Sequence, residues 1–268
     1  TGGKSMKKTL GLALGAGGAR GIAHIGFLKA LEEEGIRPDY ITGSSMGSIV
    51  GACCAKGLSA DKMKEIIEEL TAFDIVDLGF SSLGRLGLMR WTKVRKMMAG
   101  ILEDCDFSDL ESPFGCVAVD LRTGKLCEFR TGKVVDAILA SSSMPTVFRP
   151  VELDGKLLID GSVLCRVPVR QVKKMGADVV VAVDVLGKVT EVDKVSNMVS
   201  LIMRIYEIMD CANTVREQRS GRRIVDLWLE PQMEGVSQYK LKYEPSAYDA
   251  GYKIGKENAE KIRRLLSE

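Results

Sequence analysis

Short apolar runs alternate with helical patterns along the first part of the chain. The run Leu10–Leu14 is uniformly apolar and is followed by glycines, which predicts a buried strand. Residues 22–34 repeat apolar side chains at helical spacing, and Gly35 ends the pattern. The segments 39–43 and 46–56 repeat the same order of strand and helix. Two strand–loop–helix units in succession are typical of a parallel, doubly wound sheet.

The rest of the chain continues with both kinds of pattern. Helices are predicted at residues 60–70, 91–104, 134–143, 168–176, 192–218 and 248–266, and further strands at 177–185 and 224–231. Two hairpins are predicted, one around "RTG" (residues 122–124) and one with Asp154-Gly155 at its tip. We find no repeat and no linker. We therefore expect one domain over residues 6–268, after an expression remnant at residues 1–5.

Residues 71–91 break this regularity. The segment mixes large apolar side chains with glycines and shows little period, so we interpret it as a lid or as an ordinary packed loop. Basic residues lie in it and directly after it: Arg85, Arg90, Lys93, Arg95 and Lys96. Apolar side chains beside basic ones suit an anionic lipid surface, so the segment could also make a peripheral membrane contact.

Composition narrows the classes of function. The 268 residues include 38 basic and 36 acidic ones with no basic run, which argues against a nucleic-acid partner. Seven cysteines without CxxC spacing favour buried free thiols in a reducing cytoplasm. No apolar run is long enough to cross a bilayer, and no signal peptide is recognisable. We expect a cytoplasmic protein that could touch the inner face of the membrane, with its oligomeric state left open.

The pentapeptide Gly43-Ser44-Ser45-Met46-Gly47 lies between a predicted strand and a predicted helix. A sharp turn there would present Ser45 at the carboxyl end of the sheet, with Gly43 and Gly47 keeping the turn free of Cβ clashes. The N–H groups and dipole of the following helix would favour an alkoxide or an oxyanion nearby. The pattern predicts a nucleophile elbow, although the start of a buried helix rich in small residues would look the same.

A second glycine-rich loop, "GAGGARG" at residues 15–21, also follows a strand and opens a helix. The adjacent Gly17 and Gly18 allow backbone N–H groups to point together, as an oxyanion hole requires, and Arg20 adds positive charge. The glycines lack GxGxxG spacing and no GK[ST] follows, which argues against a dinucleotide-binding or phosphate-binding loop. A plain tight turn is the alternative.

A serine nucleophile normally needs a base, and the chain offers two candidates. His24, the single histidine, lies one turn into the first predicted helix, behind the glycine-rich loop, so we expect it to be a packing residue. Asp160 ends the apolar strand in "LLIDG" and would point into the same crevice as Ser45. An Asp-Gly step is often only a turn. The absence of another base favours a Ser45–Asp160 dyad, in which burial makes the carboxylate more basic.

Four blocks, in this order, resemble the patatin-like phospholipase family. "LGAGGARGIAHIG" is similar to its glycine-rich oxyanion block and "GSSMGS" to its GxSxG elbow. "ASSSMPTVFRPV" is similar to its ASxAxPxxFxPV segment and "LIDGSVLCRVPV" to its DG[GA] block. The resemblance runs from about Leu10 to Val185 and implies a three-layer α/β/α sandwich with a mostly parallel central sheet.

The same resemblance implies a lipid acyl hydrolase that uses neither metal nor cofactor. Carried over residue by residue, Ser45 is the nucleophile and Asp160 the base, while Gly17 and Gly18, with Arg20 close by, belong to the oxyanion block. The substrates would be phospholipids, lysophospholipids or other acyl esters. A thioesterase, an acyltransferase, or a non-catalytic regulator that binds acyl chains or a partner protein would share these residues.

Two positions depart from the family pattern. Ser162 follows Asp160-Gly161 where glycine or alanine is common, and it could hydrogen-bond the dyad. Arg166 stands where an asparagine is common, and it could shift the loop or tune the charge at Asp160.

The long helix predicted at 192–218 carries apolar residues that we assign to the core rather than to a partner surface: Val195, Met198, Met203, Tyr206 and Met209.

Overall fold

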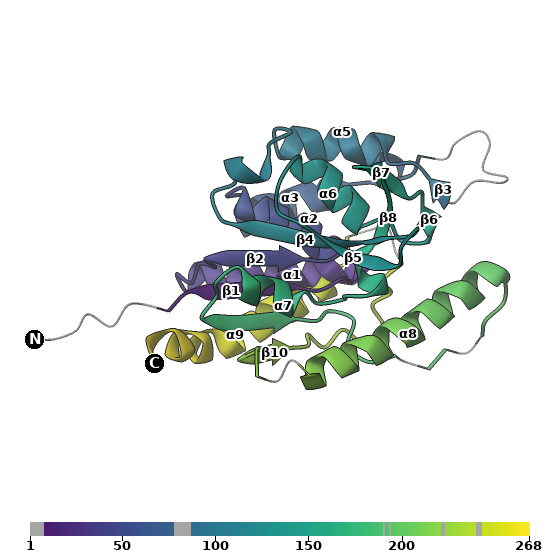
Figure 1. The fold of residues 1–268 in the computed structure, drawn as a ribbon. Helices are drawn as coiled ribbons and strands as arrows, with labels where there is room; N and C mark the ends of the chain where they lie inside the picture. Colours follow the sequence, from purple (N-terminus) through teal and green to yellow (C-terminus); the bar gives the residue numbers. More distant parts are fainter. Residues whose placement is uncertain (1–7, 78–86, 190, 193, 221–222, 240–242) are drawn as a thin grey trace, which may run out of the picture.

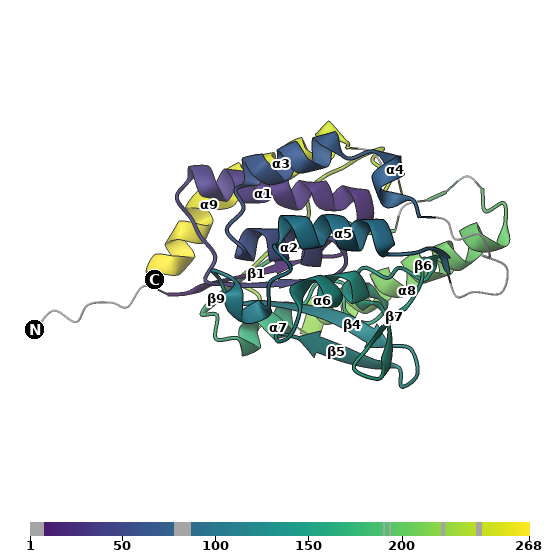
Figure 2. The ribbon, with the colours of Figure 1, turned by 90° about the horizontal axis from the view of Figure 1, so that it is seen from above.

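The computed structural model describes residues 8–77, 87–189, 191–192, 194–220, 223–239 and 243–268. Within this part of the chain, an eight-stranded sheet lies at the centre and helices cover both of its faces (Figures 1 and 2). This is the three-layer α/β/α arrangement that the sequence predicts. The single-domain organisation over residues 6–268 stays a prediction.

The sheet is parallel over most of its width and antiparallel at one end. The parallel strands are, in spatial order, β10 (Leu227–Leu229), β9 (Val179–Val183), β1 (Leu10–Leu14), β2 (Tyr40–Gly43) and β4 (Phe114–Asp120). The antiparallel pairs are those of β4 with β5 (Lys125–Phe129) and β8 (Lys156–Asp160), and of β8 with β7 (Val151–Leu153). Both hairpins lie where the turn sequences predict them.

Most helices cover one face of the sheet. This layer holds α1 (Ile22–Glu33), α2 (Met46–Ala55), α3 (Ala60–Glu69), α5 (Thr92–Ile101), α6 (Val134–Ser141) and α9 (Pro245–Ser267). The opposite face packs against α7 (Val169–Lys174), and α8 (Met198–Ser220) contacts the short 3-10 helix η3 (Gly161–Val163). Two further 3-10 helices are η1 (Gly18–Gly21) and η2 (Phe107–Asp109).

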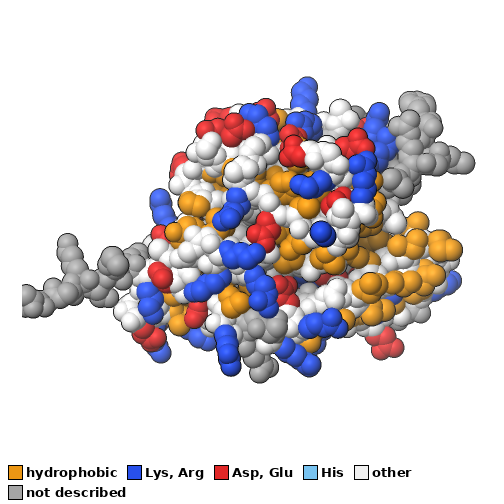
Figure 3. Space-filling view, viewed as in Figure 1, with side chains coloured by type: hydrophobic (Ala, Val, Ile, Leu, Met, Phe, Trp, Pro, Cys, Tyr) orange, Lys and Arg blue, Asp and Glu red, His pale blue; other side chains and the backbone are white. Residues whose placement is uncertain are grey.

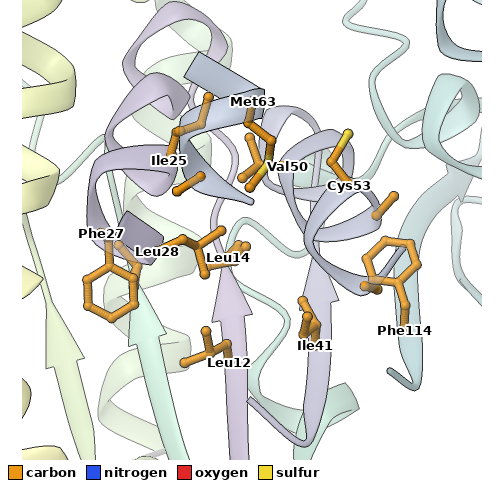
Figure 4. Close-up of a cluster of buried hydrophobic side chains, with 14 of the residues drawn as sticks. Leu12, Leu14, Ile25, Phe27, Leu28, Ile41, Val50, Cys53, Met63 and Phe114 are labelled. Carbon is orange, nitrogen blue, oxygen red and sulfur yellow. The ribbon is translucent and has the colours of Figure 1, made fainter. Parts of the chain in front are cut away.

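The period of two along β1 explains why both faces are filled. Leu12 and Leu14 point into the larger core, where Figure 4 shows them beside Phe27 and Leu28 of α1. Ala13, one residue out of phase, packs in the smaller cluster on the other face. A strand that is buried on both faces must be apolar throughout, which is what the uniform run "LGLAL" indicates.

The expected lid at residues 71–91 is described only at its ends, because residues 78–86 lie outside the described part. The first end is the short helix α4 (Ala72–Ile75), and the second is β3 (Gly87–Met89), which pairs with β6 (Thr146–Phe148). Arg90 joins the two ends through an ion pair of 3.0 Å with Asp77. Trp91 stacks on Phe148 with ring centroids 4.0 Å apart.

The prediction for α8 is partly wrong. Met203 is buried as expected, and Tyr206 is half-buried with its hydroxyl directed at η3. Val195, Met198 and Met209 are exposed instead of belonging to the core.

All seven cysteines are free thiols; four of them are buried and three half-buried.

Candidate active site

Two strands end opposite each other along one edge of β4. β2 pairs with the start of β4, ending with Gly43 opposite Cys116, and β8 pairs with the end of β4, where Asp160 lies opposite Ala118. β5 occupies the other edge of β4 over the same stretch. Because β2 is parallel to β4 and β8 antiparallel, the carboxyl ends of β2 and β8 point toward each other. Asp160 and Ser45, just beyond Gly43, are thereby brought together.

Ser45 lies in the sharp turn that the glycines of the pentapeptide predict. Its φ of +50° and ψ of −126° are rare for a residue with a Cβ atom, and it directly precedes α2. A Cβ atom on Gly47 would lie 2.2 Å from the Leu14 carbonyl oxygen, and one on Gly43 would lie 2.3 Å from the Gly47 carbonyl oxygen. Only glycine fits at both positions, so the elbow packs directly against the end of β1.

The side chains of Ser45 and Asp160 form a buried hydrogen bond. The Ser45 Oγ donates to Asp160 Oδ2 at 2.6 Å, and both residues are almost fully enclosed. Burial raises the pKa of Asp160, while hydrogen bonds from Ser162 and Ser45 partly oppose this shift. A carboxylate with a raised pKa is a stronger base, and it lies within proton-transfer distance of a hydroxyl group.

Ser162 extends the dyad by two further hydrogen bonds to Asp160, as its position after Asp160-Gly161 suggests. Its N–H donates to Asp160 Oδ1 at 2.9 Å, and its hydroxyl donates to the same oxygen. The Tyr206 hydroxyl of α8 contacts the Ser162 hydroxyl in turn. Because Ser162 Oγ gives its proton to Asp160, it accepts from Tyr206, so the chain Tyr206–Ser162–Asp160 runs from α8 into the dyad.

Arg166 forms a buried ionic cluster next to this chain. Its guanidinium lies 3.0 Å from Asp210 and 3.4 Å from Asp184, and it donates to the Gly187 carbonyl at 2.8 Å. Burial raises the pKa of Asp210 to about 7, against the opposing charge of Arg166. The ion pairs of Arg166 are thus with Asp184 and Asp210 rather than with Asp160, and the dyad keeps a short hydrogen bond.

The glycine-rich loop reaches the same site from the end of β1. Gly18 has φ of +51°, and a Cβ atom there would lie 2.3 Å from the Gln238 carbonyl oxygen. Within the described residues, the N–H groups of Gly17 and Gly18 have no protein acceptor. His24 is fully buried behind the loop, where its Nε2 donates to the Gly15 carbonyl at 2.7 Å. Burial lowers the pKa of His24 to about 4, so the ring is neutral and holds the loop in place.

Arg20 supports the loop rather than facing the dyad. Its Nε donates to the Val236 carbonyl at 2.7 Å and a terminal nitrogen donates to the Leu186 carbonyl at 3.2 Å. Its backbone N–H donates to the Gly17 carbonyl at 3.0 Å. Arg20 thereby ties the glycine-rich loop to the segments after β9 and β10.

A cavity of about 320 Å³ opens at Ser45. Its walls come from the N-terminal end of α1, from one face of α2 between Met46 and Cys53, and from α3, α5, β3 and β6, and Gly18 and Ser45 also line it. Among the described residues that line it, none carries a charge, and the polar groups are few: Ser45, Ser142, Gln238, Tyr239, Tyr243 and the Trp91 indole. An apolar cavity with few polar groups suits a ligand that combines an aliphatic chain with an ester.

Sequence reasoning missed two serines that hold the dyad. The Ser45 N–H donates to Ser141 Oγ at 3.1 Å, and the Asp160 N–H donates to the Ser143 carbonyl at 3.0 Å. Ser141 ends α6 and Ser143 lies two residues beyond it, both in "ASSSMP", the block quoted for the family resemblance without a role for these residues. The resemblance of this block to the family was the sequence feature that could have pointed to the two serines. No such feature points to Tyr206, because nothing in its local sequence indicates a polar contact.

The comparisons with known proteins identify the family of the chain. The family model described as patatin-like phospholipase matches residues 12–173, more than half of the chain. The chain belongs to this family. An uncharacterized NTE family protein of Mycobacterium tuberculosis is 38% identical over 183 residues, which are 68% of this chain and 51% of that protein. Lysophospholipase nte1 of Aspergillus fumigatus is 28% identical over 96% of this chain and 18% of its own length.

A solved structure shows the same fold. VipD from Legionella pneumophila aligns with a TM-score of 0.64 and 14% identity over 97% of this chain and 67% of its own. The present patatin-like chain spans about half the length of the mycobacterial relative and a smaller share of the fungal one.

Among the described residues, no helix is both long and apolar enough to cross a membrane. In the same part of the chain, no cluster of metal-ligating side chains occurs.

Proposed function

We propose that the chain hydrolyses fatty-acyl esters of phospholipids or lysophospholipids through the Ser45–Asp160 dyad. The observation that carries the proposal is the hydrogen bond of 2.6 Å between Ser45 Oγ and a fully buried carboxylate, at the end of an apolar cavity. The family and the lysophospholipase name of a relative support the choice of substrate. The cytoplasmic location remains a prediction.

Acylation begins when the ester carbonyl lies next to Ser45 and its acyl chain fills the cavity. Ser45 Oγ attacks the carbonyl carbon, and its proton passes to Asp160 Oδ2. The free N–H groups of Gly17 and Gly18, and the positive end of the α2 dipole, stabilise the negative charge on the carbonyl oxygen. The C–O bond to the alcohol then breaks, and the leaving oxygen takes the proton from Asp160.

Deacylation repeats the same proton transfer with water. Asp160 takes a proton from a water molecule whose oxygen attacks the acyl carbon, and Ser45 regains a proton as the fatty acid leaves. Ser162 acts on Asp160 in both halves because its hydrogen bonds reach Oδ1, the oxygen that does not contact Ser45, and Tyr206 acts on Asp160 through its contact with the Ser162 hydroxyl. Ser141 and Ser143 position the two backbones, and Arg20 supports the oxyanion loop.

The test is hydrolysis of p-nitrophenyl esters of graded chain length, with and without vesicles. We expect Ser45→Ala and Asp160→Asn to lower kcat/KM by about 10⁴-fold or more. Ser108→Ala and Asp154→Asn are matched controls, because both residues are outside the site, and they should keep the native rate. A native rate in Asp160→Asn would refute the dyad. Activity on acyl thioesters but not on oxygen esters would favour the thioesterase alternative.

A further inference from the structure

The outer face of α8 is apolar where it is most exposed. Met198 is 69% exposed, Ile208 50% and Met209 60%. Between Met198 and Met209, every exposed position carries an apolar side chain: Met198, Val199, Leu201, Ile202, Ile205, Ile208 and Met209. Figure 3 shows these side chains as a continuous hydrophobic strip over α8. An exposed apolar patch of this kind marks an interaction site on a folded protein.

The inner face of α8 prevents the helix from turning its apolar side inward. Tyr206 contacts Ser162, and Asp210 pairs with Arg166 at 3.0 Å. Thr214 accepts a hydrogen bond from the same arginine at 2.9 Å. These buried polar contacts lie at intervals of four residues along one side of the helix. They fix the rotation of α8, so the apolar strip faces outward in the folded state.

The strip lies at the end of the molecule where the cavity walls are. In both ribbon views, the N-terminal half of α8 projects beyond the sheet beside β6 (Figures 1 and 2). Thr146 of β6 contacts the Met203 sulfur, and the next two residues, Val147 and Phe148, line the cavity. Glu207 accepts a hydrogen bond from Gln238, a second cavity residue, at 2.7 Å. The helix that carries the strip therefore contacts the cavity wall through Met203 and Glu207.

Basic side chains follow the strip along the same helix face. After Met209, the exposed positions of the helix are Ala212, Arg216 and Arg219. They follow one another at spacings of three or four residues, so they lie on the same face as the strip. Lys194 is exposed just before the helix. An amphipathic helix whose apolar face is bordered by Lys and Arg lies in the plane of an anionic lipid surface, with its apolar residues among the acyl chains.

We propose that the outer face of α8 docks the protein on an anionic phospholipid bilayer. This inference rests on the proposed function, because a bilayer holds the acyl esters that the cavity would accept. Docking through α8 presents β6 and the cavity walls to the same membrane. This proposal places the membrane contact on α8, whereas the sequence analysis considered residues 71–91.

The experiment is co-sedimentation with vesicles of phosphatidylcholine and phosphatidylglycerol in equal parts. The native chain should bind, and the double variant Ile205→Gln/Ile208→Gln should bind about 30-fold more weakly because it loses two partly inserted side chains. Glutamine keeps helix propensity and adds no charge. Leu121→Gln is the matched control, since Leu121 is an equally exposed apolar residue in the β4–β5 turn, and it should bind like the native chain.

Two further measurements separate this proposal from the proposed function. Arg216→Gln/Arg219→Gln should weaken binding about tenfold on vesicles with phosphatidylglycerol and little on pure phosphatidylcholine. Hydrolysis of p-nitrophenyl butyrate, which needs no vesicle, reports on the dyad alone. Hydrolysis without vesicle binding would overturn the docking surface and leave the dyad standing. The docking surface would also be overturned if the α8 variants bound vesicles as strongly as the native chain. The same holds if light scattering showed that the native chain is a dimer and that the α8 variants are monomers.

Discussion

Ser162 sets the chemical environment of Asp160, the proposed base, more directly than any other neighbour. Two opposing influences act on Asp160: burial raises its pKa, and the hydrogen bonds of Ser162 and Ser45 lower it. Ser162 supplies two of these bonds, one from its N–H and one from its hydroxyl. The hydroxyl is itself polarised by Tyr206, since hydrogen bonds in a chain strengthen one another in a medium of low dielectric.

Ser162→Ala should therefore move the acid limb of the pH profile. The variant loses one hydrogen bond to the charged form of Asp160, so the pKa of Asp160 rises further. Since the base acts only when deprotonated, activity should disappear at a higher pH as the solution is acidified. The measurement is kcat/KM against pH, and the rate on the alkaline side should change less than about tenfold. The alanine matches the Asp-Gly-Ala form common in the family, so we expect the variant to fold.

Tyr206→Phe is the companion variant. It removes only the polarising hydroxyl, and the acid limb should move in the same direction by a smaller amount. A variant that merely loosened α8 would lower the rate at every pH and leave the limb in place. An acid limb unchanged in both variants would show that the chain Tyr206–Ser162–Asp160 has no influence on the base.

At the scale of elements, α2 forms a long wall of the cavity. Residues of one face of this helix line the cavity from Met46 through Ile49 and Val50 to Cys53. Cys53 lies eight residues beyond Ser45, which corresponds to about 12 Å of helix. In the proposed reaction we therefore expect the acyl chain to run along α2 from Ser45, with its far end near Cys53.

Cys53→Phe should shorten the preferred acyl chain. The larger side chain fills the far end of the cavity, and each methylene it displaces costs about 0.8 kcal/mol, or roughly a fourfold drop in kcat/KM. Rates on p-nitrophenyl esters of increasing length should stop rising earlier than in the native chain, while the shortest esters keep their rate. Cys53→Ala is the control and should keep the native profile. An identical profile in Cys53→Phe would mean that the acyl chain lies elsewhere.

Elements with a clear period were predictable from sequence, and those fixed by distant contacts were not. The buried run "LGLAL" matches β1 residue for residue, and the turn at Asp154-Gly155 predicts the β7–β8 hairpin. The strands β3 and β6 have three residues each, too few to show a period. The rotation of α8 escaped prediction because its apolar side chains almost surround its first half. Its inner face is selected by Ser162 and Arg166, which lie far away in the sequence.

Ser45 and Asp160 could be identified from the sequence because each lies in a short, recognisable motif. Asp160 ends a short apolar strand and Ser45 follows one by two residues, each close to a glycine, and a parallel sheet brings such strand ends to one edge. Sequence alone does not indicate that β8 runs antiparallel and meets β2 end to end along β4. That meeting, rather than a shared row of carboxyl ends, is what places the two side chains 2.6 Å apart.

At the scale of the whole molecule, the segments beyond the matched residues 12–173 complete the structure around the site. β9 lies between β1 and β10 in the interior of the sheet, and α9 packs along α1. α1 in turn carries His24, which hydrogen-bonds the Gly15 carbonyl at the start of the glycine-rich loop. The C-terminal helix is thus connected to the site through one intervening helix.

Gly251→Val tests this connection. A Cβ atom on Gly251 would lie 1.8 Å from the Ala23 carbonyl oxygen, a backbone atom of α1, so α9 and α1 must separate to admit the valine. We expect the free energy of unfolding, measured by guanidinium denaturation, to fall by about 3 kcal/mol. Lys253→Val, exposed on the same helix, carries only the lower helix propensity of valine and should cost less than about 1 kcal/mol. Equal losses in the two variants would contradict close packing of α9 on α1. A larger loss in Gly251→Val, with ester hydrolysis reduced under conditions where the protein is still folded, would show that α9 positions the oxyanion loop through α1.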